Sequence, residues 1–156
     1  MEIRKLSADE LPGSQALALL EIAQGIALIR PDWEKLRRTL FQYDVNGFFD
    51  DQTLIGYAKV NSRSAYFGRS VQIMELRYDW QHNQERFIAE MIVSLARSYR
   101  QMSSLLVMDV DAQRDFNVAF YQKMGFTRSV MPSPLGKNRV VLLANMESLL
   151  NCGIHA

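Results

Sequence analysis

The chain has 156 residues, of which 48% are hydrophobic and 22% charged, and its formal net charge is +1. This length fits one domain spanning residues 1–156, and the composition is that of a soluble globular protein, which argues against disorder. The small net charge gives no electrostatic reason to expect a nucleic acid or an acidic membrane as the main partner.

The two ends of the chain and its cysteine content predict a cytoplasmic location. Cys152 is the only cysteine, so no internal disulfide can form. Residues 1–7 lack the basic-then-apolar order of a signal peptide. The longest apolar stretch, Ala16–Ile29, is too short and too polar to span a bilayer, so we expect a core helix there. Two histidines and one cysteine give no basis for a metal site.

The first third of the chain predicts one strand and two helices. Residues 2–7 alternate polar and apolar side chains, as a strand does. Apolar residues then recur at helical spacing from Leu17 to Ile29. Arg30-Pro31-Asp32 interrupts this pattern, and Asp32 can cap a second helix from Trp33 to about Phe41.

The middle of the chain predicts strands. Asn46-Gly47 indicates a turn, and residues 47–60 are typical of a hairpin that turns at Asp50–Gln52. Residues 62–69 are polar and predict a loop. In Ser70–Tyr78 polar and apolar residues alternate well enough for a fourth strand, with Val71, Ile73, Glu75 and Arg77 on one face.

The last half predicts alternating helices and strands. Apolar spacing indicates a helix from Phe87 to Tyr99, followed by the nearly continuous apolar strand Ser104–Val110. A short helix, Asp115–Met124, ends at Gly125, a residue suited to positive φ. Strands at 126–130 and 139–145 close the domain. This order predicts an α/β (α+β) domain with a mixed, mostly antiparallel sheet that becomes parallel between its fourth and fifth strands.

The segment Asn117-Val-Ala-Phe-Tyr-Gln-Lys-Met-Gly-Phe126 carries a specific resemblance. Together with the strand order, it resembles the C-terminal half of the GCN5-related N-acetyltransferase (GNAT) superfamily. The resemblance implies a single-domain acyl-CoA N-acyltransferase fold with helices on both faces of the sheet. It also implies acetyl-CoA as acyl donor, with no metal, and direct attack by a primary amine of a small molecule or peptide. Homodimers are common in the family.

The same resemblance assigns roles around the fourth strand and the short helix. It implies that Tyr121 protonates or hydrogen-bonds the leaving thiolate, and that Asn117 contacts the pantetheine arm beside Phe120. A phenol of pKa near ~10 is a matched donor to a thiolate of pKa about 8.5. The family holds the pantetheine amides by the backbone of the fourth strand, here Leu76, Arg77 and Tyr78. Lys123 is a candidate for the 3′-phosphate of CoA.

A second motif of the family, a glycine-rich pyrophosphate loop, is missing. Residues 79–88 contain no glycine. Aligning the helix core Met91-Ile92 places Asn83, Arg86 and Ile88 at the motif positions and preserves the buried helix face. Aligning Gln81 instead places Gln84 and Arg86 at the glycines. Side chains there crowd an anion, and Glu85 repels pyrophosphate, whereas Arg86 can pair with it. The candidate phosphate contacts are therefore Asn83, Gln84, Glu85, Arg86, Phe87 and Ile88.

Glu75 is the candidate general base, because many family members keep a carboxylate near the centre of the fourth strand. Burial beside Val71 and Ile73 would raise its pKa toward the working range. A strand carboxylate paired with an arginine is the structural alternative for this residue. For the whole chain, the alternative to an enzyme is a non-catalytic GNAT-like protein that acts as an acyl-CoA sensor or a protein-interaction module.

Overall fold

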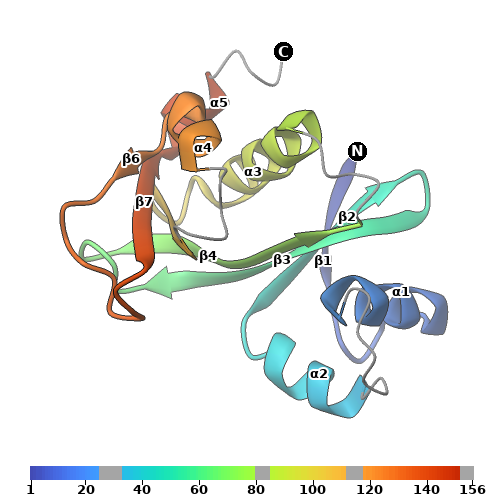
Figure 1. Cartoon of the computed structure of the whole chain (residues 1–156). Coiled ribbons are helices and arrows are strands. Elements are labelled where there is room, and N and C mark those ends of the chain that lie inside the picture. The colour runs from blue at the N-terminus through green and yellow to red at the C-terminus, as the bar shows by residue number, and fades with distance from the viewer. Residues whose placement is uncertain (25–32, 80–84, 112–117, 152–156) are drawn as a thin grey trace. The chain divides into compact units, whose positions relative to one another are not determined.

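The computed structural model describes residues 1–24, 33–79, 85–111 and 118–151 (Figure 1). Within these ranges the elements are β1 (Glu2–Leu6), α1 (Gly13–Gln24), α2 (Trp33–Leu40), β2 (Asp44–Asp50), β3 (Thr53–Ser64), β4 (Ser70–Tyr78), α3 (Glu85–Tyr99), β5 (Leu105–Asp111), α4 (Val118–Met124), β6 (Thr127–Arg128), β7 (Arg139–Asn145) and α5 (Met146–Leu150). None of the helices in these ranges is both long and apolar enough to cross a bilayer.

The described strands form one seven-stranded sheet in the order β1-β2-β3-β4-β5-β7-β6. The pairs β1–β2, β2–β3, β5–β7 and β6–β7 are antiparallel. The pair β4–β5 is parallel and matches Val71–Ile73 with Leu106–Met108. The mixed sheet and its parallel step between the fourth and fifth strands confirm the predicted fold class. By its internal contacts the chain divides into two compact units, Met1–Val60 with Glu75–Gln84, and Asn61–Met74 with Glu85–Ala156.

The first unit has its own apolar core between two helices and three strands. In Figure 1 the helices α1 and α2 pack beside β1, β2 and β3. The centre of this core consists of Leu19, Leu40, Val45, Phe49, Leu54 and Tyr57. Trp33 and Phe41 close one end, with their rings edge to face at a centroid distance of 6.5 Å. The amphipathic spacing of α2 is what turns Leu36 and Leu40 toward this core.

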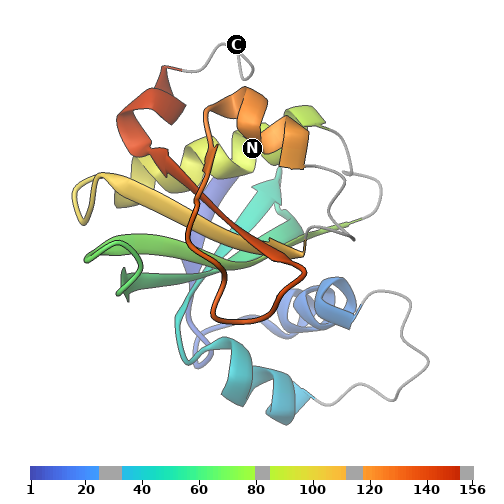
Figure 2. The same cartoon turned by 60° about the vertical axis from the view of Figure 1, so that its left-hand side comes forward.

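The second unit places its helices together. Figures 1 and 2 show α3, α4 and α5 on the same side of β5 and β7, while the connection between β6 and β7 reaches toward the other side. The inner face of α3 is fully apolar, with Ile88, Met91, Ile92 and Leu95 each at most 2% exposed. This burial follows directly from the spacing of those residues in the sequence.

Two of the predicted turns have opposite outcomes. The hairpin turns at Asp51, which has a φ of 53°, as predicted. The turn predicted at Asn46-Gly47 is wrong, because both residues lie inside β2, opposite Lys5 and Arg4 of β1. A Cβ at Gly47 would lie 2.9 Å from Leu54 Cδ1, so a larger residue at this position would require the Leu54 side chain to shift.

Smaller corrections concern element ends. The predicted loop at 62–69 begins later, because β3 continues to Ser64. The strand predicted at 126–130 is reduced to Thr127–Arg128. The helix α5 was not predicted, although its N-cap is visible in the sequence: the Asn145 side-chain oxygen accepts from the backbone N–H groups of Glu147 and Ser148.

Candidate functional site

Glu75, the predicted general base, lies in a small polar cluster between β3 and β4. Its carboxylate accepts a hydrogen bond from the Tyr57 hydroxyl at 2.9 Å, and Arg77 Nε lies 3.8 Å away. Tyr57 is 1% exposed, and burial together with the Glu75 charge raises the pKa of its phenol well above the ordinary value. Tyr57 therefore stays protonated and donates its hydrogen to the carboxylate.

The expected burial of Glu75 is wrong. Val71 and Ile73 are buried, but exposure increases along β4, and the Glu75 side chain is 37% exposed. The carboxylate is therefore open to solvent, while the hydrogen bond from Tyr57 holds its orientation. The arginine partner foreseen in the structural alternative is present as Arg77, at ion-pair distance and with its own side chain 53% exposed.

The end of β4, where the pantetheine backbone contacts were predicted, packs closely against β3. The backbone N–H of Asp79 donates to the Ile55 carbonyl at 2.8 Å. A Cβ at Gly56 would lie 2.8 Å from the carbonyl oxygen of Arg77 and 3.2 Å from Tyr78 Cβ. Glycine at position 56 is therefore required by this close approach, which fixes the path of residues 76–78.

Tyr121, the predicted acid, lies in α4 and is 5% exposed. Its ring is 5.6 Å from that of Phe120 and 6.0 Å from that of Phe126. Gly125 ends the helix with a φ of 124°, and the N–H of Phe126 donates to the Tyr121 carbonyl at 3.0 Å. The predicted glycine stop is thus confirmed, and it folds Phe126 back onto the tyrosine. Lys123 points to the exposed side of the helix, and Asn117 lies outside the described residues.

Four of the predicted phosphate contacts, residues 85–88, form the beginning of α3. Glu85 opens the helix, and Arg86 forms an i,i+4 ion pair with Glu90 at 3.5 Å with its own side chain 80% exposed. The Ile88 side chain is 2% exposed in the core, so only its backbone remains available to a phosphate. Phe87 is half-buried. Asn83 and Gln84 lie outside the described residues.

A buried carboxylate inside β5 is a structural centre of the second unit. The Asp109 side chain, 2% exposed, accepts hydrogen bonds from Tyr66 Oη at 3.0 Å, Ser133 Oγ at 2.6 Å and Arg139 Nε at 2.9 Å. Burial and the bond to Asp109 raise the pKa of Tyr66. The signal was present in the sequence as one acid inside the apolar run 105–110, but its three partners are 24 to 43 residues away.

No family model and no curated protein matches the sequence. Solved structures do match over nearly the whole chain. The aminoglycoside 6'-N-acetyltransferase from Enterococcus faecium is 10% identical, with a TM-score of 0.69 and 94% of this chain and 97% of that chain covered. The ribosomal-protein-S18-alanine N-acetyltransferase from Escherichia coli is 14% identical, with a TM-score of 0.66 and 93% of each chain covered.

Ard1 from Thermoplasma volcanium is also 14% identical, with a TM-score of 0.66 and coverage of 92% of this chain and 96% of that chain. At such identities a structural likeness establishes the fold and leaves the activity to be argued from the site. The fold that the sequence resemblance implied is therefore confirmed. The chain has the acyl-CoA N-acyltransferase fold of the GCN5-related N-acetyltransferase superfamily.

Proposed function

We propose that this protein is an N-acetyltransferase that transfers the acetyl group of acetyl-CoA to a primary amine by direct attack. The observation that carries the proposal is the arrangement of β4, β5 and α4. A parallel β4–β5 pair is followed by a helix that bears Tyr121, within a fold similar to that of solved N-acetyltransferases. The β4–β5 ladder covers only three residues of the nine-residue strand β4.

The end of β4 supports the proposal that this protein binds the pantetheine arm of acetyl-CoA. The backbone of Leu76, Arg77 and Tyr78, fixed by the close approach of Gly56, would hold the pantetheine amides. At the other end, the first turn of α3 offers backbone N–H groups to an anion, and Arg86 offers an exposed guanidinium whose partner Glu90 is 3.5 Å away. The bound donor supplies a thioester whose acetyl carbon accepts the amine.

Glu75 and Tyr121 would handle the two protons of the reaction. Glu75 takes a proton from the amine as the new C–N bond forms, directly or through a water, because its carboxylate is both oriented by Tyr57 and open to solvent. Tyr121 gives its phenolic proton to the sulfur as the C–S bond breaks, and regains one from solvent. The acceptor is a small-molecule or peptide amine.

Ligand-dependent melting tests donor binding first. Acetyl-CoA at about 100 times its Kd adds ~2.7 kcal/mol to the free energy of unfolding, so a clear rise in Tm is expected. If acetyl-CoA, propionyl-CoA and free CoA all leave Tm unchanged, the proposal is wrong. Thiol release is then measured over a panel of amines, peptides, aminoglycosides and polyamines.

The variant Tyr121→Phe separates chemistry from binding. It keeps the ring contacts with Phe120 and Phe126 and removes only the hydroxyl. We expect kcat to decrease by about 10²-fold or more while the Kd for acetyl-CoA stays within about twofold. Equal losses in kcat and affinity would contradict the acid role.

A second function, an acyl-CoA sensor or protein-interaction module without catalysis, is favoured by one specific observation. The segment before α3 has no glycine, and Arg86 is already paired with Glu90. Binding of acetyl-CoA without thiol release for any amine in the panel, at protein concentrations where the transferases of this fold turn over, supports the sensor. Turnover with any of these amines rules it out.

A further inference from the structure

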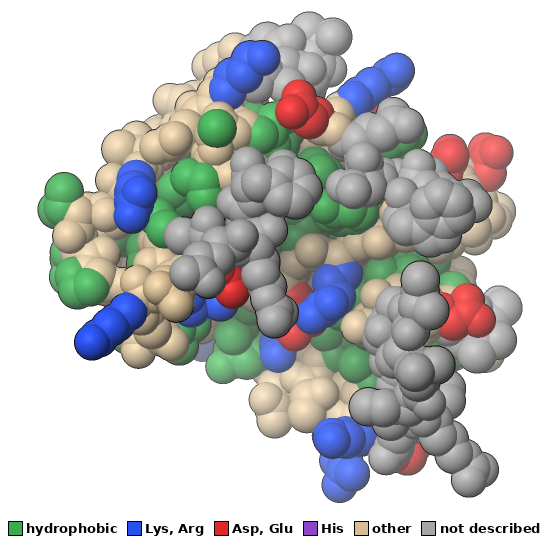
Figure 3. Space-filling view, viewed as in Figure 1, with side chains coloured by type: hydrophobic (Ala, Val, Ile, Leu, Met, Phe, Trp, Pro, Cys, Tyr) green, Lys and Arg blue, Asp and Glu red, His purple; other side chains and the backbone are tan. Residues whose placement is uncertain are grey.

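Exposed apolar side chains gather on two connections of the second unit. Seven large hydrophobic side chains are exposed in the described part of the chain, and four of them lie in these connections. Phe67 is in the β3–β4 turn and 38% exposed, while Val130, Met131 and Leu135 of the β6–β7 connection are 100%, 64% and 63% exposed. In Figure 3 hydrophobic side chains lie at the left edge, where Figure 1 places the β6–β7 connection. Such clustering marks an interaction site more often than single exposed residues do.

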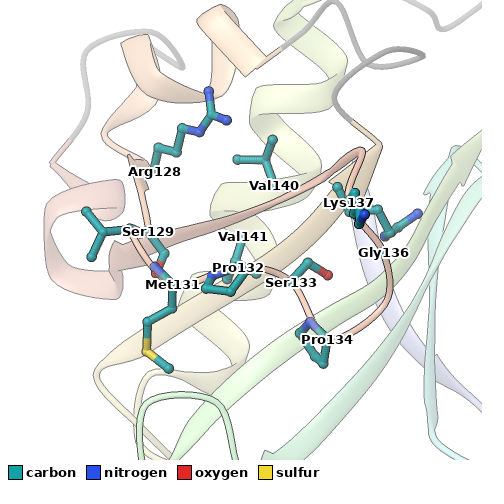
Figure 4. A pocket seen from close by; sticks show the side chains of 12 residues that line it. Arg128, Ser129, Met131, Pro132, Ser133, Pro134, Gly136, Lys137, Val140 and Val141 are labelled. Carbon is teal, nitrogen blue, oxygen red and sulfur yellow. The ribbon is translucent and has the colours of Figure 1, made fainter.

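Two adjoining open cavities of about 380 Å³ each also lie along these connections. One is lined largely by apolar side chains from both connections: Tyr66, Phe67, Met131, Pro132, Pro134 and Val141. The other, drawn in Figure 4, is lined by the β6–β7 connection and includes Arg128 and Lys137. In Figure 4 Met131 and Arg128 point away from each other, so the apolar side chain and the basic side chain lie on different parts of this surface. Each cavity can hold a bulky side chain.

The two connections, together with the strand residues next to them, carry charges of one sign. Residues 61–70 and 127–145 contain five Lys or Arg and no Asp or Glu, whereas the rest of the chain has 13 Lys or Arg against 17 Asp or Glu. Arg139 is bound to Asp109. The remaining four, Arg63, Arg69, Arg128 and Lys137, are exposed, and none has an ion pair within the described residues. This part of the molecule is therefore selectively cationic.

The surface is held in shape by the buried Asp109. Through Tyr66 and Ser133, one acid fixes both connections to β5. The Ser133 and Ser129 hydroxyls also accept backbone N–H groups of the same connection, from Leu135 and Met131. The cavities are therefore built into the folded unit.

We propose that this surface, which we call the Met131 surface (Phe67, Val130, Met131 and Leu135 with Arg63, Arg69, Arg128 and Lys137), docks an acidic protein segment that carries a bulky apolar side chain. The apolar side chain fills the cavity beside Met131, and flanking carboxylates pair with the cations. The inference goes beyond acetyl transfer and does not depend on it.

A short acidic segment fits the charges better than an extended polyanion. A bilayer or a nucleic acid is a large negative surface that extends well beyond two short cationic connections, and outside them acids outnumber bases in the sequence. A peptide contacts only the cationic part. A concave apolar cavity also suits one inserted side chain better than it suits a flat lipid surface.

Fluorescence anisotropy of labelled peptides with the full chain tests the proposal. The probes are short, end-blocked peptides with glutamates on both sides of one Phe, Leu, Met or Trp, and matched peptides with Ala at the centre or Lys in place of Glu. Met131→Ser removes the cavity wall, and Arg69→Glu/Lys137→Glu reverses two charges. The controls are Tyr43→Ser, which removes an exposed apolar side chain of the first unit, and Arg38→Glu, which reverses a charge there.

The proposal predicts salt-sensitive binding of at least one of the acidic apolar peptides. Each surface variant should weaken it by about tenfold, with both controls within about twofold, and the Ala-centred and Lys peptides should bind at least about tenfold more weakly. Three results would overturn it: no binding of any acidic apolar peptide, equal loss in the controls, or tighter Met131-dependent binding to vesicles of phosphatidylserine and phosphatidylcholine than to any peptide. Urea unfolding of each variant verifies that the fold is retained.

Discussion

Replacing Asp109 with alanine should destabilise the protein more than any surface change. The side chain is 2% exposed and accepts three side-chain hydrogen bonds, from Tyr66, Ser133 and Arg139. Each hydrogen bond to a charged group contributes about 1.5–3 kcal/mol, but the three are coupled and do not add. Breaking a buried ion pair by removing one partner costs about 3–5 kcal/mol. Because a third of the Arg139 side chain is exposed and water can solvate it, we expect a loss near ~3 kcal/mol.

Urea denaturation followed by circular dichroism measures this loss, provided that the slope m is the same in both proteins. The matched control is Asp50→Ala, an exposed carboxylate whose removal should change the free energy of unfolding by less than about 0.5 kcal/mol. A double-mutant cycle with Tyr66→Phe should give a coupling of about 1 kcal/mol or more. A loss below ~1 kcal/mol for Asp109→Ala, or no coupling to Tyr66, would show that this cluster does not hold the two connections.

Three further predictions follow from the contacts described. The pKa values of Tyr57 and Tyr66 are raised, so the stability that these two hydroxyls contribute is fully present below the unfolded tyrosine pKa of about 10 and is lost as the pH rises through the folded values. In urea unfolding between pH 8 and 11, the free energy of unfolding of Tyr57→Phe/Tyr66→Phe should therefore decline less steeply with pH than that of the unchanged protein. An unchanged slope would contradict the hydrogen-bond assignments. Gly56→Ala brings a Cβ to 2.8 Å from a carbonyl oxygen of β4, so it should lower the free energy of unfolding by about 1–3 kcal/mol and weaken acetyl-CoA binding. The control Gly13→Ala, whose Cβ would have no atom within 4 Å, should do neither. Equal unfolding curves for the two variants would refute the packing argument. Glu75→Gln should lower kcat for thiol release by about 10²-fold or more. Because the Glu75 side chain is partly exposed, the midpoint of urea unfolding should stay nearly unchanged. Full activity of this variant would show that Glu75 is not the general base.

Most of the fold was predictable because its signals are local. The apolar spacing of α3, the continuous apolar run of β5 and the glycine that ends α4 each lie within a few neighbouring residues. The predicted parallel step between β4 and β5 followed from the alternation of elements alone.

The wrong predictions concern positions whose structure is determined by residues far away in the sequence. Asn46-Gly47 is a typical turn pair, but hydrogen bonding on both sides within the sheet and the close side chain of Leu54 place it inside β2. Burial of Glu75 was inferred from its strand neighbours, although exposure increases along β4. The partners of Asp109 come from three separate segments, so no local pattern could identify them.

The sequence offers candidate residues for the cofactor side of the proposed site and none for its acceptor side. Tyr121, Glu75 and residues 76–78 belong to motifs or strand positions that a sequence displays. The hydroxyl of Tyr57, which orients Glu75, is 18 residues away in another strand, and nothing in its own neighbourhood distinguishes it from a core tyrosine.

The anchoring of the β6–β7 connection has a consequence for how tightly a partner can bind. An unanchored connection must lose its conformational freedom when it docks, at about 0.5–1.5 kcal/mol for each flexible side chain. Here Ser133 is already held by an acid in the interior, and Pro132 and Pro134 restrict the backbone on both sides of it. Much of this conformational freedom is already lost when the chain folds. A modest contact area can therefore give a measurable affinity.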